Sequence, residues 1–319
     1  MERILITGAA GFIGSHLTER MLEAGWAVMG LDAFSDFYDP ALKRRNLRRA
    51  LVHDRFELVE MDIRDAEGLN RALGRFKPQA VVHLAALAGV RPSVERADVF
   101  CDVNVTGTTR VLEAAARHGV KRFLFGSSSS VYGNNQKVPF AEADPVNEPI
   151  SPYAATKRAG ELMAHTYAHL HGLSVACLRF FTVYGPRQRP DLAIGKFMRT
   201  MAANETIGLF GDGSTSRDYT FIDDILDGLV AALEKTERFG LYNLGSHHPI
   251  RLNDLIVEIE KATGLTARTE FLPTQPGDVR RTYADLSHSQ AELGYEPRVA
   301  LAEGLQRQWQ WLRSDAVSV

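Results

Sequence analysis

The sequence predicts an α/β fold in which a doubly wound parallel sheet precedes a smaller α/β domain, and three observations carry this prediction. Short apolar runs alternate with amphipathic stretches of helical length through the first half of the chain, as in parallel strands joined by helical crossovers. A glycine-rich turn follows the first apolar run. After Arg179 the alternation becomes irregular, and short segments stand between Gly/Pro-rich loops.

The first part of the chain is expected to contain six strands and three long helices. The predicted strands are 3–6, 27–31, 56–60, 80–84, 122–126 and 174–179, and the helices are 13–24, 103–118 and 153–171. The predicted first domain spans residues 1–180 with part of 219–245. The second spans mainly 181–319 and lies over the carboxyl ends of the strands.

Charge and composition exclude two classes of partner. The chain has 37 basic and 39 acidic residues and a net charge of −2, so no overall field favours nucleic acid or a membrane surface. The first residues resemble no signal peptide and no run of 18 apolar residues occurs, which predicts a cytoplasmic protein.

Histidine and cysteine spacings predict no metal site. Cys101 and Cys177 are expected to be buried free thiols.

The glycine turn predicts a dinucleotide site. Gly8, Gly11 and Gly14 stand between a predicted strand and a predicted helix, with Phe12 and Ile13 before the last glycine. In such a turn the first glycine allows the tight bend, the second lets the backbone approach a pyrophosphate, and the third lets the helix pack on the sheet. The free amides of the helix N-terminus then face the phosphates.

Residues after the next two strands extend the cofactor site. Asp32 ends the second strand, where a carboxylate accepts hydrogen bonds from a ribose and repels a 2′-phosphate, so NAD is favoured over NADP. Lys43 is also assigned to the cofactor, although residues 43–45 are typical of a solvated helix face and keep NADP as an alternative. Asp62 and Ile63 are candidates to lie beside the adenine. The alternative is that Asp62 is simply an acid at a strand end and Ile63 a core residue.

A phenol and an amine form the predicted catalytic pair. Tyr153 and Lys157 lie four residues apart near a helix start and share one helix face. An ammonium beside a phenol, with a positive nicotinamide ring, stabilises phenolate and lowers the tyrosine pKa. Residues 127–130 are four serines after a buried strand. At the carboxyl end of a strand these hydroxyls are suited to donate to a reacting oxygen.

In this order the glycine turn, the serine turn and the Tyr153/Lys157 pair resemble the extended short-chain dehydrogenase/reductase family of nucleotide-sugar enzymes, from Gly8 through Asp278. The resemblance implies a Rossmann-type sheet, bound NAD, a UDP-sugar substrate, and a homodimer formed by helices 103–118 and 153–171. Packing on the sheet explains the apolar faces of those helices equally well.

Carried over by position, the resemblance implies roles for individual residues. Tyr153 would be the acid and base and Lys157 its electrostatic partner, while Ser128 would assist at the sugar oxygen with Ser129 beside it. The segment 83–86 and one asparagine match positions that line the cofactor and support the site. These are Leu84, Ala85, Ala86 and Asn104, whereas His83 by itself is better explained as a packed strand-end histidine.

The serine turn also separates the reactions of the family. Related 4,6-dehydratases carry Thr-Asp-Glu at positions 128–130, and UDP-glucuronate decarboxylases carry Glu at 130, whereas this chain has only serines there. The extra acid-base step of those enzymes therefore lacks its residues, and oxidation followed by re-reduction at C4 remains. Because hydride is returned, NAD would stay bound. A net dehydrogenase and a non-catalytic NAD sensor are alternatives, although the sensor would not need Tyr153 and Lys157.

Substrate recognition is expected from the second half of the chain. Arg217 and Asp278 lie in segments that resemble the family's diphosphate and nucleotide loops, and a guanidinium is well suited to phosphate. Galactose epimerases carry Arg where Gln275 stands, so one diphosphate contact is missing or comes from elsewhere, with Arg280 as a candidate.

Three features of the sequence resemble UDP-glucuronate 4-epimerases more than they resemble galactose epimerases. They are Thr182, where galactose epimerases carry Asn, and the segments 37–40 and 187–191. A C6 carboxylate needs a hydroxyl and a cation, which Thr182 and Arg189 could provide, although Arg189 could equally be a solvated loop residue. Arg91 is assigned to the substrate with its role open. The predicted reaction interconverts UDP-glucuronate and UDP-galacturonate. The alternatives are UDP-glucose/UDP-galactose epimerisation and, less favoured, decarboxylation or dehydration.

Overall fold

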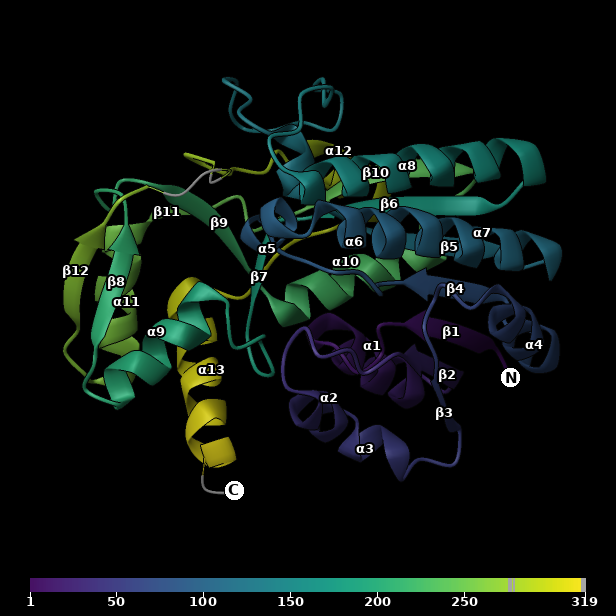
Figure 1. Cartoon of the computed structure of the whole chain (residues 1–319), viewed down its shortest axis with the longest axis horizontal. Helices are drawn as coiled ribbons and strands as arrows, with labels where there is room; N and C mark the ends of the chain where they lie inside the picture. Colours follow the sequence, from purple (N-terminus) through teal and green to yellow (C-terminus); the bar gives the residue numbers. More distant parts are fainter. Residues whose placement is uncertain (275–276, 278, 317–319) are drawn as a thin grey trace.

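The structure, a computed structural model, describes residues 1–274, 277 and 279–316, and a seven-stranded parallel sheet forms its centre (Figure 1). The strand order is β10-β6-β5-β4-β1-β2-β3, so the sheet is wound in both directions from β1. The expected Rossmann-type α/β fold is therefore confirmed. The strands are β1 Arg3–Thr7, β2 Ala27–Asp32, β3 Phe56–Glu60, β4 Ala80–His83, β5 Arg122–Ser128, β6 Ser174–Phe180 and β10 Phe239–Leu244.

Helices cover both faces of this sheet. One face carries α1 (Phe12–Glu23), α10 (Ile222–Lys235) and α12 (Ser287–Leu293), and the other carries α4 (Ala66–Phe76), α7 (Thr108–Arg117) and α8 (Pro152–His171) (Figure 1). Short helices lie at the edges of these layers: α2 Pro40–Asn46 and α3 Arg48–Leu51 beside α1, and α5 Val90–Glu95 and α6 Ala97–Cys101 beside α8.

The central strand shows why the chain folds in this way. Ile4 and Ile6 pack into the core on one side of the sheet and Leu5 packs into the core on the other, and all three are fully buried. A strand that is buried on both faces needs a continuous apolar run, which is what a parallel sheet covered by helices requires. The local sequence therefore determines both the strand and its central position.

Helix α8 has clear start and stop signals. Ser151 caps its N-terminus by accepting a hydrogen bond from the Ala154 amide at 3.2 Å, and Pro152 occupies the first helical position. Gly172 ends the helix in the left-handed conformation with φ of +65°. These signals fix the position at which Tyr153 enters the first turn.

The remaining elements form a second group beside the sheet (Figure 1). They are the strands β7 Thr182–Tyr184, β8 Thr206–Phe210, β9 Ser216–Phe221, β11 Pro249–Arg251 and β12 Arg268–Leu272, and the helices α9 Ala193–Ala202, α11 Leu252–Thr263 and α13 Leu301–Ala316. Strands β11, β9 and β7 form one small sheet and β12 pairs with β8. Between these pieces, α10 and β10 return to the large sheet, and the division into two domains remains a prediction.

Two expectations need correction. The predicted helix 103–118 is not a regular α-helix throughout, because residues Asp102–Gly107 form a π-helical turn before α7 begins. Cys101 is exposed rather than buried, since α6 directs Phe100 into the core and Cys101 away from it, whereas Cys177 is buried in β6. Within the described residues, none of the helices combines the length and apolar character needed to cross a membrane.

Candidate active site

A cleft of about 610 Å³ opens at the carboxyl ends of the central strands and extends to the loop that follows β7. This volume is in the range of small-molecule sites. The structure brings most of the predicted residues to its surface, namely Gly8, Gly11, Phe12, Ile13, Gly14, Asp32, Lys43, Asp62, Ile63, Leu84, Ala85, Ala86, Ser128, Ser129, Tyr153, Lys157, Thr182, Arg189 and Arg217.

The glycine turn forms a backbone cradle at one end of the cleft. Gly8 has φ of +71°, and a Cβ there would lie 2.8 Å from the amide nitrogen of Ala85. A Cβ on Gly14 would collide with the carbonyl oxygen of Gly8, so α1 could not pack this closely on the turn with any other residue. A Cβ on Gly11 would instead project where the cleft is open, since only the Gly8 carbonyl oxygen lies within 4 Å, at 3.1 Å.

Asp32 lies at the end of β2 beside this cradle. Its carboxylate oxygens accept hydrogen bonds from the amides of Ala10 at 3.1 Å and Phe34 at 2.8 Å. Burial raises the pKa of Asp32, while these amides and the charge of Lys43 act to lower it. The carboxylate is thus oriented by the backbone, and it faces the cleft where a ribose hydroxyl could donate to it.

Lys43, Asp62 and Ile63 line the same end of the cleft but already have protein contacts. Lys43 is buried, and its Nζ donates to the carbonyl oxygen of Ser35 at 2.8 Å. Burial lowers the pKa of Lys43. Asp62 accepts from Arg64 at 2.7 and 3.0 Å. The methyl end of Ile63 lies against the position where Gly107 would carry a Cβ.

The segment after β4 is held from behind by Asn104. The Asn104 side chain accepts from the Leu87 amide at 2.8 Å, donates to the Leu87 carbonyl at 2.9 Å, and donates to Thr156 Oγ1 at 3.1 Å. It lies outside the residues that line the cleft, so it supports the site without facing it. His83 is buried between Thr7 and Thr108, at 2.7 and 2.9 Å, and burial lowers its pKa to about 3.

Tyr153 reaches the serine turn at the centre of the cleft. The Ser128 hydroxyl lies beside the phenol in the cleft, and Ser128 Oγ accepts from Ser130 Oγ at 2.9 Å. Burial raises the pKa of Tyr153, while the neighbouring Ser128 hydroxyl and the charge of Arg189 act to lower it. The expected lowering of this pKa is therefore not found in the protein alone, because desolvation outweighs both opposing effects.

Lys157 is buried one helical turn after Tyr153. Its Nζ donates to the carbonyl oxygen of Gly126 at 2.7 Å and lies 5.9 Å from the centre of the Tyr153 ring. Burial lowers the pKa of Lys157 to about 8, while the charge of Glu161 acts to raise it. A cation is therefore still available next to the phenol at neutral pH.

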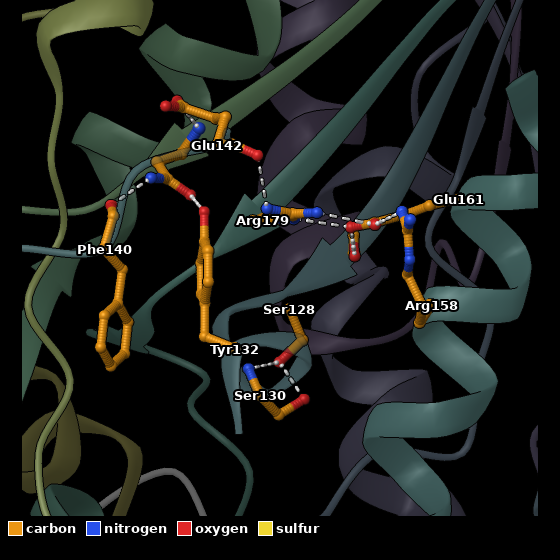
Figure 2. A network of polar contacts seen from close by, with 10 residues as sticks. Ser128, Ser130, Tyr132, Phe140, Glu142, Arg158, Glu161 and Arg179 are labelled. Carbon is orange, nitrogen blue, oxygen red and sulfur yellow. Dashed lines mark hydrogen bonds and ion pairs between the residues drawn. The ribbon is translucent and has the colours of Figure 1, made fainter. Parts of the chain in front are cut away.

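A buried polar network lies next to the serine turn (Figure 2). Glu161 accepts from Ser127 Oγ at 2.6 Å and from two nitrogens of Arg179 at 2.9 and 3.0 Å. The Arg179 guanidinium lies 4.7 Å from the centre of the Tyr132 ring, and Tyr132 donates to Asn243 at 2.7 Å. The network therefore connects α8, β5, β6 and β10 immediately behind the reacting groups.

Thr182 and Arg189 lie on the substrate side of the cleft. Thr182 begins β7, directly after the end of β6. Arg189 donates through Nε and Nη2 to the carboxylate of Asp191 at 3.0 and 2.7 Å, and its side chain is only 15% exposed. With so little exposure, Arg189 is not a solvated loop residue, and its charge acts to lower the pKa of Tyr153.

The other predicted substrate residues are distributed unevenly. Arg217 on β9 lines the cleft, and its Nη1 donates to the carbonyl oxygen of Ser216 at 2.9 Å. Arg91 and Arg280 are exposed and lie outside the lining, and the Arg91 guanidinium stacks 4.2 Å from the centre of the Phe210 ring. Asp278 and Gln275 lie outside the described residues.

Sequence reasoning missed several polar side chains at the site. Ser35 and Arg64 line the cleft, but they lie in loops whose spacing carries no signal, whereas Tyr38 lies in the segment 37–40 that the resemblance had indicated without giving this residue a role. Glu161 was also missed, although a signal for it exists: it follows Lys157 by four residues, as Lys157 follows Tyr153, so the three share one face of α8. Among the residues with assigned coordinates, no cluster of three metal-ligating side chains occurs.

The glycine cradle on this doubly wound sheet, with a buried lysine one helical turn after a tyrosine in the same cleft, defines the class: a Rossmann-fold protein with a dinucleotide-type site. The chain belongs to the NAD dependent epimerase/dehydratase family, whose model matches residues 4–245. This membership confirms the expected enzyme class and the expected cofactor, NAD.

Individual relatives agree with this assignment. The chain is 41% identical to a UDP-glucuronate 4-epimerase from Thermodesulfobacterium geofontis over 316 residues, covering 99% of this chain and 97% of that protein. It is also similar to the crystal structure of a UDP-glucuronic acid 4-epimerase from Bacillus cereus in complex with UDP-glucuronic acid and NAD. That comparison gives a TM-score of 0.92 at 36% identity and covers 98% of this chain and 99% of that one. A UDP-glucose 4-epimerase from Thermotoga maritima, solved with UDP-glucose, gives a TM-score of 0.91 at 34% identity with the same coverage.

Proposed function

We propose that this protein interconverts UDP-glucuronate and UDP-galacturonate by transient oxidation at C4 with bound NAD. The observation that carries the proposal is that Tyr153, with Ser128 beside it, lines one cleft together with the glycine cradle and with Thr182 and Arg189. Relatives that are named as UDP-glucuronate 4-epimerases align with nearly the whole chain.

The residues at one end of the cleft fit a dinucleotide. The open space at Gly11 lets a pyrophosphate approach the backbone at the N-terminus of α1. Asp32 would accept from the adenosine ribose, and Asp62 and Ile63 would lie beside the adenine. Held there, NAD supplies the acceptor and then the donor of the C4 hydride.

Proton transfer at C4 is assigned to Tyr153. As phenolate, Tyr153 takes the proton of the 4-hydroxyl, and after the sugar turns its other face it returns the proton to the C4 oxygen. Ser128 would hold the reacting oxygen, because its hydroxyl lies beside the phenol and lines the same cleft. Lys157 stabilises the phenolate through its charge.

The preference for a uronate rests on Thr182 and Arg189. In Arg189 the Nε and Nη2 donors are used by Asp191, while the guanidinium has five N–H donors in all, so it can also bind a substrate carboxylate. Arg217 would hold the diphosphate from β9. UDP-glucose/UDP-galactose epimerisation is the second candidate, because the Thermotoga maritima relative was solved with UDP-glucose.

Incubation of the protein with UDP-glucuronate and, separately, with UDP-glucose tests the proposal, with products identified by NMR. We expect UDP-galacturonate from the first and little or no product from the second. Faster formation of UDP-galactose would favour the second candidate, and a UDP-pentose as the main product would indicate decarboxylation.

We also propose a homodimer formed through α7 and α8. Leu162 and Leu170 on α8 are 53% and 66% exposed. A second copy packed on this surface would cover them. Sedimentation of the wild type and of Leu162→Glu tests this: a dimer that becomes a monomer supports the proposal, and a monomeric wild type contradicts it.

A further inference from the structure

A second cavity of about 680 Å³ lies between the first and second parts of the chain, apart from the glycine cradle. Helix α2, the loop at residues 187–190, the end of α9 and the last turns of α13 line it. In Figure 1, α2 and the end of α13 are both found at the lower side of the molecule. The volume is large enough for a nucleotide-sized ligand.

The lining of this cavity is strongly basic. Five arginines contribute to it, namely Arg45, Arg187, Arg189, Arg199 and Arg313, and no carboxylate does so among the described residues. Glu19 and Asp191 are not among the lining residues, and they pair with Arg187 and Arg189. Since the whole chain has a net charge of −2, this concentration of positive charge is local and favours an anion.

One of these arginines has an unsatisfied buried donor. Arg187 donates twice through Nη2 to Glu19, at 2.8 and 3.0 Å, while its Nη1 is buried and has no hydrogen-bond partner among the residues that the structure describes. A buried charged donor without an acceptor is costly. Burial also lowers the pKa of Arg199. Phosphate oxygens bind well to guanidinium groups of arginines that line a cavity of this kind.

The side of the cavity formed by α13 is aromatic. Trp309 and Trp311 line it together with Leu312, and all three are partly exposed. Flat rings of this kind stack on nucleobases, and arginine planes do the same. Phosphate-binding cations and stacking surfaces in one cavity match the two ends of a nucleotide.

Two residues belong to both cavities. Tyr38 and Arg189 line the second cavity and also the cleft. We propose that the second cavity binds a nucleoside monophosphate and that its occupancy changes the affinity of the cleft for the sugar nucleotide through Arg189 and Tyr38. This site is additional to the proposed catalytic one.

Tryptophan fluorescence provides a direct measurement. The chain has three tryptophans, and two of them line the second cavity while none lines the cleft. In the Trp26→Phe variant with saturating NAD, which blocks the cofactor site, we expect adenosine monophosphate to quench the emission in a saturable manner. Adenosine and inorganic phosphate should each bind at least tenfold more weakly. This titration does not depend on the proposed reaction.

Variants locate the effect. Arg313→Ala in the Trp26→Phe background should weaken adenosine monophosphate at least tenfold and Arg313→Lys less so, whereas Arg268→Ala, an exposed arginine on β12, should leave the affinity unchanged. The nucleotide should shift KM for UDP-glucuronate in Trp26→Phe but not after Arg313→Ala. Absence of quenching, equal affinity for adenosine, undiminished affinity in Arg313→Ala, or a KM shift that persists in that variant would each overturn the proposal.

Discussion

The carboxylate of Glu161 and the guanidinium of Arg179 form a two-point ion pair of 2.9 and 3.0 Å, and both side chains are only 1% exposed. The pair joins α8 to β6 behind the serine turn (Figure 2). Burial by itself would raise the pKa of Glu161, but the hydrogen bonds and charge of Arg179 lower it. A charged carboxylate is thereby maintained one helical turn from Lys157, whose pKa it acts to raise.

Glu161→Gln should therefore affect both stability and activity. Removing one member of a buried pair leaves the other charge uncompensated, which costs about 3 kcal/mol of the free energy of unfolding. Lys157 would also lose a negative charge that favours its protonated form, so its pKa should fall. The decrease of kcat at alkaline pH should therefore begin at a lower pH than in the wild type. Urea unfolding and a kcat profile against pH measure the two effects. The matched control is Glu113→Gln, which breaks an exposed pair with Arg117 and should change neither the stability nor the pH profile. Equal behaviour of the two variants would contradict the role of Glu161.

Tyr153→Phe tests the proton transfer. The variant keeps the ring, which packs edge-on against Phe100 at 6.4 Å, and loses only the hydroxyl beside Ser128. We expect kcat to fall by roughly 10²–10⁴-fold, as for loss of a general base, with unchanged affinity for NAD and for UDP-glucuronate. Affinity by calorimetry and kcat by NMR give the comparison. A variant that remains within tenfold of the wild-type kcat would remove Tyr153 from the mechanism.

Arg189→Ala tests the choice of sugar. If its guanidinium binds the C6 carboxylate, its loss should raise KM for UDP-glucuronate by tenfold or more, since a hydrogen bond to a charged group contributes about 1.5–3 kcal/mol. KM for UDP-glucose, which has no carboxylate, should change much less. The two substrates therefore serve as each other's control in one variant. Equal increases for both would show that Arg189 acts on the nucleotide or on the loop in general.

The sequence could predict those parts of the site that depend on local patterns. The continuous run Ile4, Leu5 and Ile6 identifies a strand buried on both faces, and helical spacing identifies Tyr153 and Lys157 as neighbours. Fold class and cofactor follow from such patterns. Glu161 was accessible by the same spacing, but its role becomes visible only with Arg179 beside it.

Other parts of the site depend on contacts between distant segments. The conformation of the loop with Arg189 is set by α1, through His16 and Glu19, which precede the loop by about 170 residues. No local pattern encodes such a contact. The π-helical turn at Asp102–Gly107 is similar: it places Asn104 against Leu87 and Thr156, which no helical periodicity predicts. The direction of the Tyr153 pKa shift likewise depends on burial, which the motif alone does not give.

The contact between α1 and this loop predicts a specific sensitivity to acid. His16 Nε2 lies 2.9 Å from the carbonyl oxygen of Pro186, and the pKa of His16 is lowered to about 4, first by burial and then by the charge of Arg187. In the unfolded chain the pKa is near 6.5. Between these values the unfolded state binds a proton and the folded state does not, so the free energy of unfolding falls as pH falls from about 6.5 towards 4.

The effect is isolated by comparing the wild type with His16→Gln, whose amide can still donate to Pro186 but does not titrate. Urea unfolding at pH 7 and pH 4.5 should show that the wild type loses on the order of 2–3 kcal/mol more than the variant, because each pKa unit corresponds to about 1.4 kcal/mol. Parallel losses in the two proteins would mean that His16 does not titrate differently on folding. If only the wild type shows this extra loss of stability, protonation of His16 on α1 destabilises its contact with the loop that holds Arg187 and Arg189.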